Sequence, residues 1–195
     1  MTGHSHADCL SFELSVKGKR VFVNSGVFEY ENSEKRISQR KTKAHNTISV
    51  NGLDSSEVWQ SFRVARRAYP KNVKVKDNRI SSCHDGYERN FKKILHSRKW
   101  EITQNSVNID DAIAGEFKKA EAFFHIHPDI KIEQSNPESA NLFSENKLIC
   151  TVSCPNHVVK VVDNLWSPEF GKELSSQTLY VELKTNELRT SIDLS

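Results

Sequence analysis

Gly3-His4-Ser5-His6-Ala7-Asp8 runs directly into Cys9-Leu10-Ser11-Phe12-Glu13-Leu14-Ser15-Val16, and this opening stretch decides the fold. From Leu10 to Val16, apolar residues alternate with polar ones, which is the two-residue period of a half-buried β-strand. His4 and His6 follow the same period, so both imidazoles project to one side of an extended backbone. We therefore expect the two histidines to open the first strand of a β-sheet protein.

The segment that follows returns antiparallel to the first. Lys17-Gly18-Lys19 supplies a turn, and Arg20-Val21-Phe22-Val23 continues as the second strand of a hairpin. This pairing brings Asn24 to the end of the hairpin at which His4 and His6 lie. Local pairing alone thus predicts a polar site that contains these three side chains.

Short alternating segments continue along the remainder of the 195 residues. Turn signals such as Asn51-Gly52 and Asp77-Asn78 separate them, and His45 heads one of them. The best helical candidate is residues 112–124, a short segment broken by Gly115. We therefore expect one all-β domain over residues 1–195, a large antiparallel two-sheet β-sandwich of supersandwich type with few or no helices.

Composition excludes several classes of protein. The chain is 36% hydrophobic and 27% charged, as in ordinary globular domains. No apolar run approaches the roughly 20 residues of a membrane-spanning helix. The net charge of +3 is too small to predict nucleic-acid binding. Local basic clusters would suit an acidic ligand, although each could equally be a solvated strand face: Arg36, Arg40, Lys41 and Lys43, and then Arg63, Arg66 and Arg67.

His4, His6, Asp8, Asn24 and His45 form the one cluster whose members stand at strand ends that we expect to meet. Neutral imidazole is a good zinc ligand, and catalytic zinc sites usually have three protein ligands and one open position. A carboxylate or amide oxygen can serve as the third ligand. The same residues could equally form a hydrogen-bonded polar patch, and residue types alone leave both interpretations open.

Several motifs resemble a known family over nearly the whole chain. They are Gly3–Asp8, Val23–Gly26, His45–Thr47, His84–Tyr87 and Trp166–Gly171. In these motifs the sequence is similar to the C-terminal domain of the heparinase II/III-like polysaccharide lyases, a group that includes alginate lyases. The part beyond Gly171 is the least distinctive.

The resemblance implies a fold and an activity. Such enzymes pair an N-terminal α/α-toroid with a C-terminal antiparallel β-sandwich, and they cleave uronic-acid polysaccharides by β-elimination where the two domains meet. We accordingly expect this chain to be a piece of a longer protein, with an acidic polysaccharide as substrate and little lyase activity on its own. The family habit further implies a periplasmic or extracellular location in bacteria.

The resemblance also assigns roles to individual residues. His4 matches a histidine that faces the active site, and Tyr30 is the expected active-site phenol. His6 and His45 match two zinc ligands. The third ligand is usually an aspartate, and Asn24 stands in its place here. A neutral amide oxygen should weaken zinc binding or shift the metal preference.

Two further residues are expected at the substrate. Arg40 and His84 would contact an acidic sugar, although either could instead pair with a nearby carboxylate. Phe28 stands where relatives commonly have tyrosine. Together with Asn24, it leaves open a second interpretation, in which the domain is a non-catalytic carbohydrate-binding or structural module whose site has decayed.

Overall fold

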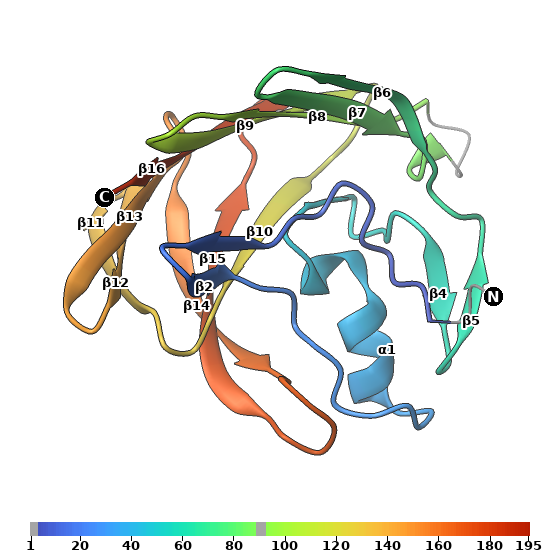
Figure 1. Cartoon of the computed structure of the whole chain (residues 1–195). Helices are drawn as coiled ribbons and strands as arrows, with labels where there is room; N and C mark the ends of the chain where they lie inside the picture. Colours follow the sequence, from blue (N-terminus) through green and yellow to red (C-terminus); the bar gives the residue numbers. More distant parts are fainter. Residues whose placement is uncertain (1–3, 89–92) are drawn as a thin grey trace.

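A computed structural model describes residues 4–88 and 93–195 and shows an all-β protein with two large antiparallel sheets (Figure 1). This architecture confirms the expected sandwich. The first sheet is six-stranded and has the order β1-β2-β10-β15-β14, with β3 also paired to β10. Its strands are β1 (Leu14–Val16), β2 (Lys19–Phe22), β3 (Ile48–Val50), β10 (Ala120–Ile126), β14 (Val159–Trp166) and β15 (Leu174–Glu182).

The second sheet is eight-stranded and has the order β11-β12-β13-β16-β9-β8-β7-β6. A separate hairpin of β4 (Glu57–Trp59) and β5 (Arg63–Ala65) lies beside the sandwich. The strands of the second sheet are β6 (Pro70–Lys76), β7 (Arg79–His84), β8 (Leu95–Ile102), β9 (Ser106–Ala114), β11 (Lys131–Asn136), β12 (Ser139–Ser144), β13 (Lys147–Ser153) and β16 (Glu187–Leu194).

The core contains the inward faces of both sheets. On β10, the buried Phe124 and Ile126 alternate with side chains of the opposite face, and on β9 Ile109 and Ile113 do the same. Asp111 occupies a position of this same inward series of β9 and is also buried. A charged residue is therefore built into the core face of the second sheet.

The N-terminal segment differs from the expected strand. Residues 4–13 form no strand, because Leu10 takes a positive φ of 60° and breaks the extended backbone before β1 begins at Leu14. Backbone hydrogen bonds hold the segment as a loop, including Ala7 N–H to Arg40 C=O at 2.8 Å. The turn at Lys17-Gly18 is confirmed, with φ values of 50° and 78°. We call residues 4–13 the histidine loop.

The one described α-helix lies where the sequence showed only a polar segment. Helix α1 (Glu34–Arg40) begins after Ser33, whose hydroxyl caps the N–H of Arg36, and a 3₁₀ turn (Thr42–Ala44) follows it. The expectation of few or no helices is confirmed, and residues 112–124, the best helical candidate, are not helical. That segment is the end of β9, a turn and the start of β10, and the turn contains Gly115 at a φ of 98°.

Within the described residues, no helix has the length and apolar character required to cross a membrane. The four cysteines are free thiols: Cys9, Cys83, Cys150 and Cys154.

Candidate functional site

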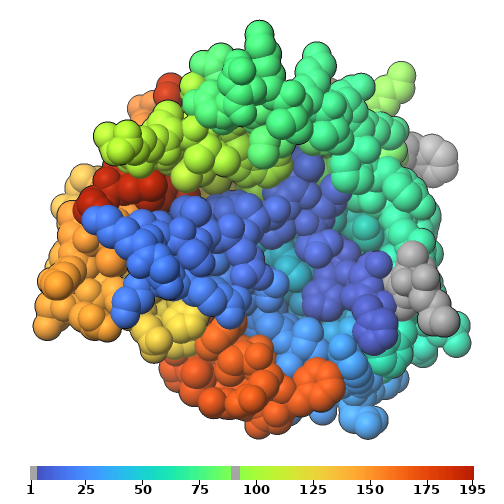
Figure 2. Space-filling view, in the orientation of Figure 1, coloured from blue at the N-terminus to red at the C-terminus, as the bar shows by residue number. Residues whose placement is uncertain are grey.

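The histidine loop lies on the surface, where segments from later in the chain border it (Figure 2). His4 is exposed, and its ring contacts Tyr30 and Phe62 edge-on with centroid distances of 5.1 Å each. Tyr30 also contacts Phe170 at 4.6 Å. We call these four residues the aromatic patch. Tyr30, Phe62 and Phe170 are 40%, 41% and 59% exposed, and exposed apolar surface of this kind marks an interaction site.

A chain of three side chains lies beneath the aromatic patch. The guanidinium of Arg36 lies 5.0 Å from the ring centroid of Tyr30, and its Nη1 is 3.2 Å from Nε2 of His6. Nδ1 of His6 is in turn 3.3 Å from Nε2 of His45. Arginine can only donate, so Nε2 of His6 accepts, Nδ1 of His6 carries the proton, and Nε2 of His45 accepts. Arg36 thus sets the tautomer of both histidines.

Both imidazoles are neutral at physiological pH. Burial, followed by the charges of Arg36 and Arg40, lowers the pKa of His6 to about 4. Burial also lowers the pKa of His45 well below its ordinary value, with His6 as the next cause. Neutral imidazole nitrogens are available as hydrogen-bond acceptors or metal ligands.

Asn24 has its amide engaged away from the two histidines. Its Nδ2 donates to Glu13 at 2.6 Å, and its Oδ1 accepts from the N–H of Gly26 at 2.8 Å. Among the residues that the structure describes, no group of three histidine, cysteine, aspartate or glutamate side chains is placed to hold a metal ion.

The donor set can be tested against the geometry of zinc. Two nitrogens bound to one tetrahedral zinc at ordinary bond lengths are about 3.3–3.4 Å apart, and Nδ1 of His6 and Nε2 of His45 are 3.3 Å apart. However, a zinc bound at Nδ1 of His6 requires the proton on Nε2, where it would face the N–H donor of Arg36. The site also contains the guanidinium of Arg36, and the amide of Asn24 is bonded to Glu13 and Gly26. In this arrangement the residues do not fit zinc.

Arg40 and His84, the two expected substrate contacts, are both fully buried. Arg40 donates to backbone carbonyls, among them Gln60 at 2.8 Å and Ser5 at 3.0 Å. It therefore holds the histidine loop against the β4–β5 hairpin. Neither side chain presents surface to a ligand here, because each is fully covered by the chain itself.

His84 belongs to a buried chain of hydrogen bonds. The N–H of Gly86 donates to Nδ1 of His84, so Nε2 of His84 donates to Nδ1 of His96, and Nε2 of His96 donates to Asp111 at 2.6 Å. Burial lowers the pKa of His84 to about 3, and His96 is the next cause. One backbone N–H thus sets the tautomer of two histidines.

Arg98 completes this network and connects it to the site. Its Nε and Nη2 donate to the two carboxylate oxygens of Asp111 at 2.7 and 3.0 Å. Its Nη1 donates to the carbonyls of Leu10 and Asn46, both at 2.7 Å. The guanidinium of Arg98 therefore binds both the histidine loop, at Leu10, and Asn46, the residue that follows His45.

Sequence reasoning missed the roles of Arg36, Arg98 and Asp111. Arg36 appeared only as a member of a basic cluster. A usable signal existed for Asp111, because it interrupts the apolar series Val107, Ile109 and Ile113 on the inward face of one strand. A carboxylate in such a position requires a buried partner.

The fold and this loop define a class, namely an antiparallel β-sandwich whose N-terminal histidine loop lies against a buried arginine. The chain belongs to the family described as "Heparinase II/III-like, C-terminal", whose model matches residues 1–195. No curated protein matches the chain.

Solved structures share the fold. A heparinase III structure is 16% identical to this chain and superposes with a TM-score of 0.76. The match covers 98% of this chain and 31% of the heparinase III chain. Heparan sulfate lyase HepC from Pedobacter heparinus is 15% identical with a TM-score of 0.70 over 97% of this chain and 31% of its own. At these identities the likeness concerns the fold. The chain thus spans about 31% of the length of these solved relatives.

Proposed function

We propose that this chain is the β-sandwich part of a polysaccharide lyase that cleaves uronic-acid-containing acidic polysaccharides by β-elimination. Family membership supports this proposal, as do the names of the solved relatives, a heparinase III and a heparan sulfate lyase. The observation that carries it is the exposed imidazole of His4 in contact with the exposed phenol ring of Tyr30. Two groups able to exchange protons are thus presented together at the surface.

The reaction requires groups of these types. A base removes the proton on the carbon next to the uronate carboxylate, and the electron pair of that C–H bond becomes a new carbon–carbon double bond. The bond to the glycosidic oxygen breaks, and this oxygen takes a proton from an acid. The side chains proposed to transfer these protons are His4 and Tyr30. A nearby positive charge stabilises the negative charge that develops on the carboxylate.

Arg36 is the positive group proposed for this site, and because its side chain is fully buried, it is proposed to act on the developing charge from beneath the aromatic patch without contacting the substrate. Its guanidinium lies 5.0 Å from the ring centroid of Tyr30 and 5.7 Å from that of Phe62. Its pairing with His6 is incompatible with the zinc position tested above, so we propose that Arg36 is the resident cation of the site and derive no step through a metal. Arg40 and His84 are proposed to hold the loop.

The proposed partners follow from the same reasoning. Because the chain spans about 31% of its solved relatives, we propose that an α/α-toroid domain supplies the remaining catalytic groups and the opposite wall of the cleft. The proposed substrate is a polymer that does not cross membranes, which favours a periplasmic or extracellular location.

The test uses the chain joined to its toroid domain and follows the absorbance of the unsaturated uronate product from acidic polysaccharides. His4→Ala and Tyr30→Phe should each lower the rate by about 10²–10⁴-fold, as expected for loss of a proton-transfer group. Tyr69→Phe is a matched control, since Tyr69 is 59% exposed and lies outside the patch. Rates of both variants equal to that of Tyr69→Phe would contradict the roles of His4 and Tyr30. Absence of product from every acidic glycan would favour the non-catalytic binding module.

A further inference from the structure

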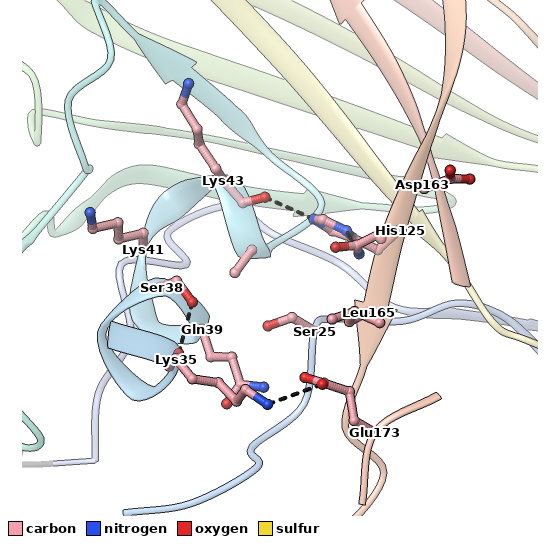
Figure 3. A pocket seen from close by; sticks show the side chains of 12 residues that line it. Ser25, Lys35, Ser38, Gln39, Lys41, Lys43, His125, Asp163, Leu165 and Glu173 are labelled. Atoms are coloured by element: carbon pink, nitrogen blue, oxygen red, sulfur yellow. Dashed lines mark hydrogen bonds and ion pairs between the residues drawn. The ribbon is translucent and has the colours of Figure 1, made fainter. Parts of the chain in front are cut away.

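A cavity of about 570 Å³ lies between α1 and β14 (Figure 3). Lys35, Ser38 and Gln39 line it from the helix, whereas Asp163 and Leu165 line it from β14. This volume lies within the range of small-ligand sites, about 300–1,000 Å³. Arg36 of the same helix contacts Tyr30 and Phe62, so α1 borders both the cavity and the aromatic patch.

The charges around the cavity leave one cation available. Lys35 is paired with Glu173 at 3.0 Å, and Lys43 with Glu121 at 3.0 Å. Across residues 4–88 and 93–195, no ion pair is found for Lys41, which is exposed. Its side chain extends outward from the end of the helix (Figure 3), so its ammonium is free at the rim of the cavity to take an anionic group from a ligand.

The wall opposite the helix contains a neutral histidine that is held by hydrogen bonds. Nε2 of His125 donates to the carbonyl of Lys43 at 2.9 Å, so Nδ1 accepts from Asn164 and Thr178, also at 2.9 Å each. Burial lowers the pKa of His125 to about 4 and so keeps the ring neutral. At the lining, the hydroxyl of Ser25 is buried and has no hydrogen-bond partner among the described residues. These groups are fixed before any ligand arrives.

The chemical mixture identifies the kind of ligand. Leu165 is 49% exposed and offers an apolar surface to the carbon face of a sugar ring. Asp163 offers a carboxylate that can accept from sugar hydroxyls, and Lys41 offers a cation for a sugar carboxylate. The combination of cation, acceptor and apolar surface fits an acidic sugar.

We propose that this cavity is a second glycan-binding site that takes a uronate unit of an acidic polysaccharide, with Lys41 bound to the carboxylate and Leu165 beneath the ring. The acidic class of glycan rests on the proposed function, whereas the site itself rests on the cavity and its side chains. The loop after β14 connects the two regions, because Phe170 contacts Tyr30 and Glu173 lines the cavity. A helix with its side chains is only about 10–12 Å wide, so one polymer chain can occupy both regions.

The test measures binding to the 195-residue chain by calorimetry. The probe is a heparosan hexasaccharide, in which glucuronate alternates with N-acetylglucosamine, and maltohexaose and inorganic phosphate are the comparisons. Lys41→Glu should weaken hexasaccharide binding about tenfold or more, equivalent to about 1.4 kcal/mol. Lys74→Glu makes the same charge change on β6 in the other sheet and should change binding by less than about twofold.

A labelling experiment locates the site without any substitution. The hexasaccharide should protect Lys41 from an amine-reactive reagent and leave Lys74 reactive, as read by mass spectrometry. Equal labelling of Lys41 with and without glycan would overturn the proposal, and so would equal weakening by the two variants or an absence of binding. Maltohexaose or phosphate binding as tightly as the hexasaccharide would also overturn it. Hexasaccharide binding that depends on Lys41, in a protein whose toroid-joined form yields no unsaturated product, would support this site and contradict the lyase.

Discussion

Replacing Asp111 with asparagine tests the network that holds the proposed site in place. The carboxylate is fully buried and accepts from Arg98 at 2.7 and 3.0 Å and from His96 at 2.6 Å. Asparagine keeps the shape but removes the charge, and its NH₂ group must face one of these donors. The variant therefore leaves the buried guanidinium of Arg98 without a counter-ion.

The expected cost follows from burial. Removing one partner of a buried ion pair costs about 3–5 kcal/mol, because the other charge stays desolvated. For a domain of this size, about 2–4 °C of melting temperature corresponds to each kcal/mol, so Asp111→Asn should lower the melting temperature by roughly 6–20 °C. A change of this size is a large fraction of the whole stability of a typical domain, about 5–15 kcal/mol.

The assay is urea unfolding of both proteins, with the midpoint and slope compared. Glu101→Gln is the matched control, because Glu101 pairs with Arg79 at 2.8 Å on the surface, where the two side chains are 41% and 70% exposed. An exposed pair contributes about 0–1 kcal/mol. If the free energy of unfolding of Asp111→Asn were within about 1 kcal/mol of the wild-type value, the reasoning about the buried network would be refuted.

The same substitution has a pH signature. Burial alone would raise the pKa of Asp111, but Arg98 and His96 outweigh it, and the net pKa lies below the ordinary value. Stability from this group is therefore complete above the unfolded pKa and is lost as pH falls through the folded pKa. Asp111→Asn should lack this loss of stability at low pH. If the variant lost stability with falling pH as the wild type does, the role given to Asp111 would be contradicted.

Three further predictions concern the loops and the histidines. Gly26→Ala should lower the free energy of unfolding by several kcal/mol, because the φ of Gly26 is 75° and the new Cβ would lie 1.8 Å from the carbonyl oxygen of Ser167. Gly171 has a similar φ of 71° but open space around it. Gly171→Ala is therefore the control and should cost only about 1–2 kcal/mol in urea unfolding. Because burial holds the pKa of His6 near 4, below its unfolded value of about 6.5, stability should rise as pH increases from about 4 to 6.5, and His6→Gln should reduce that slope. Elemental analysis of the wild-type protein should find less than one zinc per chain, and Asn24→Asp should raise the zinc content. Stoichiometric zinc in the wild type that is lost with His45→Ala would contradict the proposed role of Arg36.

The sandwich could be predicted from the sequence because its signals are local. Alternation of apolar and polar residues is set by strand geometry, and Lys17-Gly18 and Asn51-Gly52 take the positive φ values that tight turns need. The same reasoning failed at the first strand, where alternation continued through Leu10 although the backbone turns there. Tertiary hydrogen bonds, such as that between Ala7 and Arg40, decide the conformation of such a loop.

Helix α1 could not be found by hydrophobic periodicity because its buried face is polar. The buried side chains of this helix are Arg36, Gln39 and Arg40, and they bond to loops rather than packing in an apolar core. An apolar period of 3.6 residues is therefore missing although the helix is partly buried. The proposed site depends on this helix, so residue types alone could bring His6 and His45 together but could not place a cation beside them.

The neutral amide of Asn24 and the positive charge of Arg36 are consistent with one another at this site. A carboxylate at position 24 could offset a metal dication beside His6 and His45, whereas Asn24 is neutral and has its oxygen bound to Gly26. Arg36 carries a single positive charge to the same place and bonds His6 directly. A dication beside that guanidinium, with no carboxylate to offset either charge, would be strongly repelled in a buried setting. A neutral Asn24 and a nearby Arg36 therefore favour the same outcome, a site whose cation is part of the chain.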